Sequence, residues 1–224
     1  MSDSKKNVLK GLILIMSQTI HMKRKKVITL DVSKLRYEMH RLWCMVIDAG
    51  EAPDLLVGIA TGGELCAREI CSNVPAGMKV VALRRPTTEL KQHSTFRRLL
   101  WRLPYAISNR LRLIEDRLLE LQAGQADRPI IAPVTEELRA GVAEVAATVK
   151  ERASRCVLVI DDAIDSGATM GRVVTELRAA LPHDTRILTA VLTQTRATSI
   201  FTPDFRLHYG VLLRFPWSLD FRGV

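Results

Sequence analysis

The chain has 224 residues and a formal net charge of +9. This length suffices for one α/β domain with additional helices, and no Pro-, Gly- or Ser-rich linker or internal repeat divides it. The longest apolar stretch near the N-terminus, residues 8–16, is interrupted by Lys10 and Gly11 and is too short to span a bilayer. No small-residue cleavage site follows this stretch, so we expect a cytoplasmic protein without a secretory signal. The positive charge leaves nucleic acid open as a partner.

Strand and helix patterns alternate after an N-terminal extension of residues 1–26, for which we expect a helix. Apolar runs rich in β-branched residues predict strands, and apolar residues at helical spacing predict helices. The expected strands cover residues 27–31, 54–60, 79–83, 156–160, 186–192 and, in one or two pieces, 205–213, and the first two expected helices cover residues 32–47 and 64–71. Such alternation predicts a mostly parallel sheet whose ligands lie at the carboxyl ends of the strands.

The segment at about residues 85–135 interrupts this alternation. From Leu103 to Leu121 apolar residues recur at steps of four and three, and arginines stand between them. This pattern predicts a basic amphipathic helix that begins after Pro104. We expect an insertion that packs on the domain; a helix between subunits and a nucleic-acid or membrane surface are the alternatives. Thr135, which precedes two glutamates, predicts the N-cap of a further helix.

Residues 157–169 combine an apolar strand, two adjacent carboxylates and a short turn that leads into a helical pattern. Gly167 permits a positive φ, and the hydroxyls of Ser166 and Thr169 are hydrogen-bond donors. Consecutive backbone N–H groups in such a turn face an anion at the positive end of the following helix. The turn therefore predicts a phosphate site. The two carboxylates beside it, which suit ribose hydroxyls or a hydrated Mg²⁺, are Asp161 and Asp162.

This stretch resembles the phosphoribosyl-diphosphate (PRPP) loop of the type I phosphoribosyltransferases, and the resemblance is closest to the bacterial xanthine-guanine and hypoxanthine enzymes. Their opening strand is similar to residues 27–31, and their closing Pro-Trp-Asp is similar to Phe215-Pro216-Trp217 followed by Asp220. The resemblance implies a single α/β domain over residues 27–224, with a mostly parallel central sheet flanked by helices. An N-terminal helix, the inserted basic helix at about 85–135 and a small C-terminal hood-like segment would be added to it.

A second motif follows the strand at 54–60 and resembles the diphosphate-binding loop of the same family. Two glycines after a strand allow a backbone to approach an anion closely. A tight turn is the better explanation of an isolated glycine pair, but the position of this pair about a hundred residues before the PRPP loop favours diphosphate binding. Arg is common in the family where Thr61 stands here. The implied diphosphate-binding residues are Thr61, Gly62 and Gly63.

The resemblance also implies roles for single residues. Asp165 would act as the general acid or base on the nucleobase, with capping of the turn as the alternative. The 5′-phosphate would be bound by Asp165, Ser166, Gly167, Ala168 and Thr169, and Asp161 and Asp162 would bind ribose and Mg²⁺, the metal through water. In the base pocket, Gln194 takes the place of the family's Lys and Leu212 that of its stacking aromatic residue. The expected pocket residues are Gln194, Leu212 and Leu213.

The activity implied by the resemblance is PRPP- and Mg²⁺-dependent transfer of ribose 5-phosphate to a nucleobase, with a purine-like base as the expected acceptor, and release of diphosphate. PRPP and a nucleobase would be its small-molecule partners, and the chain would self-associate as a dimer or tetramer. The first alternative is a regulatory protein of the same fold that senses PRPP or nucleotides and binds a partner or nucleic acid. The second is an enzyme with a non-standard acceptor. Nucleic acid is the less favoured partner, and no membrane is expected.

Overall fold

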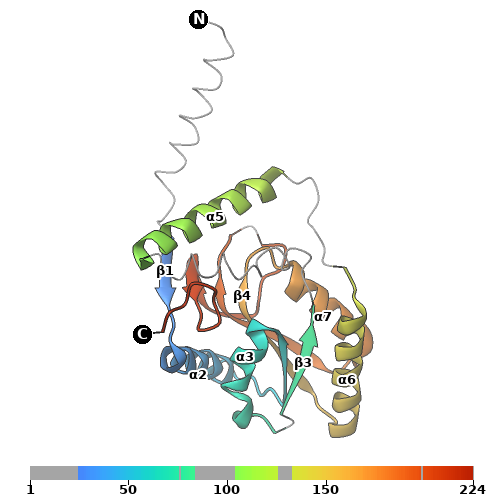
Figure 1. The fold of residues 1–224 in the computed structure, drawn as a ribbon. Coiled ribbons are helices and arrows are strands. Elements are labelled where there is room, and N and C mark those ends of the chain that lie inside the picture. Colours follow the sequence, from blue (N-terminus) through green and yellow to red (C-terminus); the bar gives the residue numbers. More distant parts are fainter. Residues whose placement is uncertain (1–24, 76, 84–103, 126–132, 198, 224) are drawn as a thin grey trace, which may run out of the picture.

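The computed structural model describes residues 25–75, 77–83, 104–125, 133–197 and 199–223, drawn in colour in Figure 1. The expected N-terminal helix and the outer parts of the expected insertion lie outside these residues. Five strands form the central sheet in the order β3-β2-β4-β5-β6, and every neighbouring pair is parallel. Their bounds are β2 Leu55–Ala60, β3 Met78–Ala82, β4 Cys156–Ile164, β5 Arg186–Gln194 and β6 Phe205–Tyr209. The predicted mostly parallel α/β architecture is confirmed.

Helices cover both faces of this sheet (Figure 1). Side chains that alternate along the strands divide the buried residues into two clusters. One cluster packs against α2 (Val32–Asp48) and α3 (Gly62–Arg68), and the other against α6 (Glu136–Arg152) and α7 (Ala168–Ala180). A short 3-10 helix, η1 (Cys71–Asn73), follows α3. The central strands read as continuous apolar runs because both of their faces are buried.

Side-chain caps fix the start of two of these helices. Asp31 accepts a hydrogen bond from the backbone N–H of Lys34 at 2.7 Å, so α2 begins one residue later. The hydroxyl of Thr135 accepts one from the backbone N–H of Leu138 at 3.2 Å. The predicted N-cap of α6 is thereby confirmed, and its first turn carries two glutamates that favour the positive helix end.

The two ends of the described chain meet in a second, small sheet. Strand β1 (Lys26–Thr29) pairs in parallel with β7 (Val211–Arg214), and the backbone N–H of Leu30 donates to the carbonyl of Arg214 at 2.8 Å. The expected last piece of strand is therefore split between β6 in the central sheet and β7 in the small one. Among the described residues, no helix is long and apolar enough to cross a membrane.

The expected inserted helix is present as α5 (Tyr105–Gln125) and begins directly after Pro104. Its orientation, however, differs from that of an ordinary amphipathic helix. Three apolar side chains of the predicted stripe are 43–52% exposed, whereas the polar side chains Ser108 and Asp116 are buried against the domain. Ser108 bonds to the buried Arg214 and Asp116 bonds to Lys25, so the inward face of α5 is polar. The three exposed side chains are Ile107, Leu111 and Ile114.

Candidate functional site

The two adjacent carboxylates lie in the second half of β4, next to the end of β2. The prediction ended this strand at residue 160, but pairing with β5 continues to Ile164 opposite Gln194. Asp161 is 5% exposed, and its Oδ1 accepts a hydrogen bond from the backbone N–H of Asp162 at 2.9 Å. The pair therefore belongs to the rigid sheet rather than to a loop. A rigid strand holds both carboxylates at a fixed position before any ligand binds.

The turn after β4 has the backbone conformation that the sequence predicts. Gly167 has φ = 81° and precedes the first residue of α7. A Cβ atom on Gly167 would lie 2.5 Å from the Ser199 hydroxyl and 2.8 Å from the backbone nitrogen of Phe201, so both φ and space require glycine. The backbone N–H of Ile200 donates to the carbonyl of Ser166 at 2.8 Å. The loop between β5 and β6 thus holds the turn in place.

This turn lines a narrow pocket of about 10 Å³ together with the end of β4. That volume is about the size of one water molecule. The pocket itself is therefore too small for a phosphate group, and phosphate binding at the mouth of the turn stays a prediction. The pocket is lined by Asp161, Ala163, Ile164, Asp165, Ser166, Gly167, Ala168, Thr169 and Met170, which include all five predicted 5′-phosphate residues.

The glycine pair after β2 approaches the acidic part of β4 closely. A Cβ atom on Gly62 would lie 2.1 Å from Oδ2 of Asp162, and one on Gly63 would lie 2.3 Å from the carbonyl oxygen of Ile160. Both glycines are therefore needed for packing against β4, a reason that the sequence argument did not include. Thr61 is exposed and follows a cis peptide bond from Ala60. Diphosphate binding by this loop stays a prediction.

Burial and the acidic pair both raise the pKa of the Cys66 thiol, which lies next to this loop on α3. Cys66 on α3 is fully buried. Burial raises the pKa of its thiol well above the usual value, and the negative charges of Asp162 and Asp161 raise it further. Cys66 is consequently a neutral packing group and not a nucleophile.

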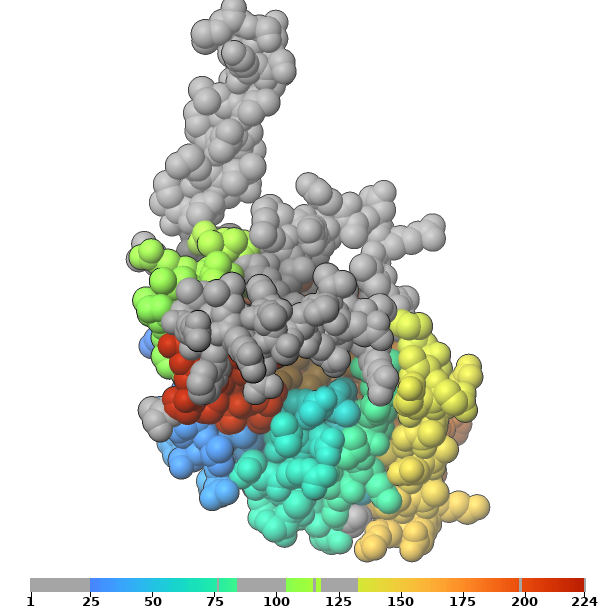
Figure 2. Space-filling view, viewed as in Figure 1, coloured from blue at the N-terminus to red at the C-terminus, as the bar shows by residue number. Residues whose placement is uncertain are grey.

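Trp217 reaches the acidic pair from the C-terminal segment. Its indole Nε1–H donates to Oδ2 of Asp162 at 3.1 Å, and its ring stacks on Phe215 with a centroid distance of 4.9 Å. From the sequence we expect Trp217 to be a core residue, with stacking on the substrate ring as the alternative; its bond to Asp162 was not predicted. Figure 2 shows this C-terminal segment in red at the surface, between α5 in green and the β2–α3 region in cyan. The segment therefore borders the site.

Asp165, the predicted acid or base, is held by the segment after β5. Its Oδ1 accepts a hydrogen bond from the hydroxyl of Thr195. The backbone N–H of Thr195 donates in turn to the carbonyl of Ile164 at 2.8 Å. These bonds orient one carboxylate oxygen of Asp165 toward β5, at the carboxyl end of the sheet.

The three residues expected in a base pocket occupy different environments. Gln194 is 3% exposed; its Nε2 donates to the carbonyl of Arg196 at 3.0 Å and its Oε1 accepts from Arg206 at 2.6 Å. Leu213 is 5% exposed and packs in the core cluster on the α2 side. Leu212, the neighbouring strand residue, points to the opposite face and is half-buried. Contact of any of the three with a base stays a prediction.

A buried arginine connects the terminal strands to α5, and sequence reasoning missed it. Arg214 is 0% exposed, and its Nε donates to Asp220 at 2.9 Å. Burial alone would raise the pKa of Asp220, but hydrogen bonds from Arg112 and Arg214 and their charges lower it to about 2. The remaining guanidinium donors of Arg214 bond to Thr29, Ser108 and Asn109 at 2.7–3.0 Å, and its guanidinium lies over the ring of Tyr105.

Carboxylate oxygens are suitable ligands for Mg²⁺, and the site offers those of Asp161 and Asp162. Within the described residues, no group of three or more His, Cys, Asp or Glu side chains gathers to form a closed metal site. Mg²⁺ commonly keeps several waters and binds through one or two carboxylates plus phosphate oxygens of a substrate. The acidic pair fits this open kind of coordination.

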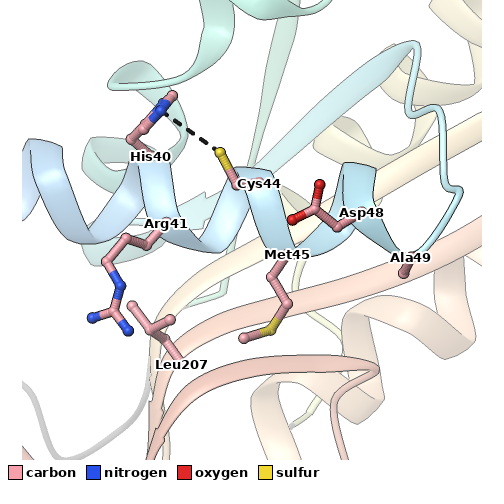
Figure 3. A pocket seen from close by; sticks show the side chains of 7 residues that line it. All are labelled: His40, Arg41, Cys44, Met45, Asp48, Ala49 and Leu207. Atoms are coloured by element: carbon pink, nitrogen blue, oxygen red, sulfur yellow. Dashed lines mark hydrogen bonds between the residues drawn. The ribbon is translucent and has the colours of Figure 1, made fainter.

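A larger concavity of about 610 Å³ lies elsewhere, on α2 and β6 (Figure 3). Nε2 of His40 lies 3.6 Å from Sγ of Cys44, one helical turn further along α2. Leu207 lines the side of the concavity that β6 forms. Neither the acidic pair nor the glycine-containing turn lines this concavity. We therefore assign the candidate site to the end of β4 rather than to the larger hollow.

Comparison with known proteins rests on structure alone, since no protein-family model and no curated protein matches the sequence. The xanthine-guanine-hypoxanthine phosphoribosyltransferase of Helicobacter pylori is 13% identical, with 87% of this chain and 95% of that chain covered and a TM-score of 0.50. A purine phosphoribosyltransferase from Pyrococcus horikoshii is 16% identical, with 88% and 97% covered and a TM-score of 0.49. The chain has the type I phosphoribosyltransferase fold.

Proposed function

We propose that this protein is a phosphoribosyltransferase that transfers ribose 5-phosphate from PRPP to a nucleobase, in the presence of Mg²⁺, with release of diphosphate. The observation that carries the proposal is the arrangement at the end of β4, where a rigid acidic pair, Asp161 and Asp162, stands beside a turn built around Gly167. The fold shared with the Helicobacter enzyme supports it. Cytoplasmic location and self-association stay predictions.

The turn would bind the 5′-phosphate of PRPP. Backbone N–H groups of residues 166–169 and the hydroxyls of Ser166 and Thr169 are the donors, and the N-terminus of α7 adds a favourable dipole. The carboxylates of Asp161 and Asp162 would accept hydrogen bonds from the ribose hydroxyls. Mg²⁺ held by these carboxylates would neutralise charge on the leaving diphosphate. Backbone N–H groups near Thr61, Gly62 and Gly63 would bind that diphosphate.

In the reaction, the bond between C1 of the ribose and the diphosphate oxygen breaks, and the diphosphate leaves with the electron pair. A ring nitrogen of the acceptor forms the new bond to C1. Asp165 would take the proton that this nitrogen loses, while Thr195 holds the other side of the carboxylate in position. C1 gains positive charge as the old bond breaks, so catalysis depends mainly on positioning and on nearby negative charge.

The direct test is diphosphate release from PRPP by the purified protein with Mg²⁺ and a panel of nucleobases. Asp165→Asn should slow release by about 10²–10⁴-fold with PRPP affinity nearly unchanged, because it removes the proton acceptor and keeps the shape. Asp184→Asn is the matched control, since Asp184 is exposed in the turn before β5. Measurable PRPP binding without diphosphate release for any base would contradict catalysis, and equal loss of binding in Asp165→Asn would make Asp165 a structural cap.

A regulatory protein that senses PRPP or nucleotides is the second candidate. The net charge of +9 and the exposed arginines Arg110 and Arg117 on α5 favour it, because clustered basic side chains attract nucleic acid. Such a protein would bind RNA or DNA in a salt-dependent manner that changes with PRPP. Retention on a nucleic-acid column at low salt tests this candidate, and absence of retention removes it.

A further inference from the structure

The outward face of α5 carries an exposed apolar stripe. Ile107, Leu111 and Ile114 are 45%, 43% and 52% exposed, and their spacing of four and three residues places them on one side of the helix. The helix lies at one end of the molecule, above β1 and β4 in Figure 1. Apolar side chains that are exposed next to one another mark interaction sites, whereas single ones do not. The stripe is therefore a candidate interaction surface.

Polar contacts on the inward face of α5 hold the stripe in this orientation. Ser108 and Asn109 accept hydrogen bonds from the fully buried Arg214 at 3.0 and 2.7 Å. Asp116 forms an ion pair with Lys25. A rotation of α5 that buried the stripe would break these contacts and remove acceptors from a buried guanidinium, which is costly. The outward direction of the stripe is thus a fixed feature of the fold.

Two exposed arginines flank the stripe. Arg110 is three residues after Ile107, and Arg117 is three residues after Ile114, so both lie next to the stripe on the helix surface. An arginine side chain can lay its methylene groups along apolar surface while its guanidinium reaches a phosphate. We call these two arginines and the three apolar residues the α5 face. This face combines apolar side chains with groups that bind anions.

The positive charge of the chain is concentrated in the two segments that meet at α5. Residues 1–26 contain seven basic residues and one acidic residue, and residues 85–135 contain nine basic and five acidic residues. Their combined net charge of +10 exceeds the +9 of the whole chain, so the rest of the chain is almost neutral. The two segments meet because Lys25, near the end of the first, contacts Asp116 in the second. A negatively charged partner is therefore attracted to this end of the molecule.

We propose that the α5 face docks this protein on an anionic lipid bilayer, with α5 in the plane of the interface. The apolar side chains would enter the boundary between headgroups and acyl chains, and the two arginines would pair with lipid phosphates. A second copy of the chain fits this face less well, since its positive charges would repel those of the first. Nucleic acid fits the charge but not the apolar stripe. The proposal differs from the sequence-based expectation of no membrane partner because the stripe faces outward.

Sedimentation of the full chain with lipid vesicles tests this proposal. Vesicles of phosphatidylcholine alone are compared with vesicles that also contain phosphatidylglycerol, each at low and at high salt. The protein should bind the neutral vesicles about tenfold or more weakly than the anionic ones, because only the latter attract its basic residues. Binding to the anionic vesicles should weaken as the salt concentration rises, since salt screens this attraction.

Two sets of substitutions separate the apolar and the basic part of the α5 face. The triple variant Ile107→Gln, Leu111→Gln and Ile114→Gln should bind anionic vesicles about tenfold or more weakly, because Gln keeps the helix and removes the apolar contact. The double variant Arg110→Gln and Arg117→Gln should lose about fivefold in binding for each charge.

Matched controls come from other helices, and circular dichroism checks that every variant is folded. The controls should bind the anionic vesicles as the wild type does, because they change exposed residues outside the α5 face. They are a triple variant on α2, Val32→Gln with Met45→Gln and Ile47→Gln, and a double variant on α6 and α7, Arg152→Gln with Arg178→Gln.

Absence of wild-type binding to anionic vesicles overturns the proposal, as does unchanged binding of the triple or the double variant of the α5 face. Self-association that the triple variant loses, without vesicle binding by the wild type, would assign the face to a second copy instead. Retention on RNA or DNA without vesicle binding would assign it to nucleic acid. The double variant keeps the test decisive even where the triple variant does not fold. Vesicle binding is independent of the proposed transferase activity, which diphosphate release tests separately.

Discussion

Replacement of Asp220 by Asn should destabilise the junction between α5 and the two terminal strands. The Asp220 side chain is 6% exposed and accepts hydrogen bonds from Arg112 and from the fully buried Arg214. Asn keeps one acceptor oxygen but removes the charge, so Arg214 becomes a buried cation without a carboxylate. Removal of one partner from a buried ion pair costs about 3–5 kcal/mol of unfolding free energy. We expect about 3 kcal/mol, because Arg214 keeps its other acceptors.

The same carboxylate makes this effect depend on pH. Burial would raise the pKa of Asp220, yet the two arginines lower it from 3.8 to about 2. A lowered pKa in the folded state contributes stability above the unfolded pKa, and this stability is lost as the pH falls toward 2. The difference between 3.8 and about 2, at about 1.4 kcal/mol per pH unit, corresponds to about 2.5 kcal/mol. Roughly 1 kcal/mol of it should be lost by pH 3.

Urea unfolding followed by circular dichroism at pH 7, 5 and 3 provides the measurement. Wild type and Asp220→Asn should differ by about 3 kcal/mol at pH 7 and 5, and by about 2 kcal/mol at pH 3. Asp184→Asn, an exposed substitution in the turn before β5, should follow the wild type throughout. Wild-type stability of Asp220→Asn at pH 7, or a difference that stays constant between pH 7 and pH 3, would refute this reasoning.

Three further substitutions test separate parts of the site and the fold. Gly62→Ala should weaken PRPP binding and lower the unfolding free energy by about 1–3 kcal/mol, because its Cβ would lie 2.1 Å from Oδ2 of Asp162. Calorimetric titration measures the binding and thermal melting measures the stability. Trp217→Phe keeps an aromatic ring beside Phe215 but removes the donor to Asp162, so PRPP affinity should fall several-fold, by about 1 kcal/mol, in a fluorescence or calorimetric titration. Thr135→Ala should lower the unfolding free energy by about 1 kcal/mol and leave PRPP affinity unchanged, whereas a change in affinity would show that the N-cap of α6 influences the site.

The order and type of the elements could be predicted from the sequence because the patterns are local. Continuous apolar runs identify strands buried on both faces, and the turn around Gly167 combines several independent signals in five residues. The end of β4 was harder to predict from the sequence. β4 continues four residues past the predicted end because β5 offers hydrogen-bond partners as far as Gln194, and this pairing is not encoded by the apolar run alone.

The orientation of α5 could not be predicted, since hydrophobic periodicity assumes that the apolar face of a helix is the buried one. Here Ser108 and Asp116 face inward because they meet Arg214 and Lys25, which lie 106 and 91 residues away along the chain. Likewise, the contact between Trp217 and Asp162 joins residues 55 positions apart. A single sequence without an alignment contains no signal for such distant pairs.

The pairing of β1 with β7 bears on how this protein folds during its synthesis. The partner of the first strand is residues 211–214, so β1 cannot be paired until the ribosome has translated nearly the whole domain. The central strands β2 and β3 emerge much earlier and are already adjacent in the sheet. A nascent chain that is stalled before residue 211 should therefore leave the first strand unpaired and exposed to chaperones.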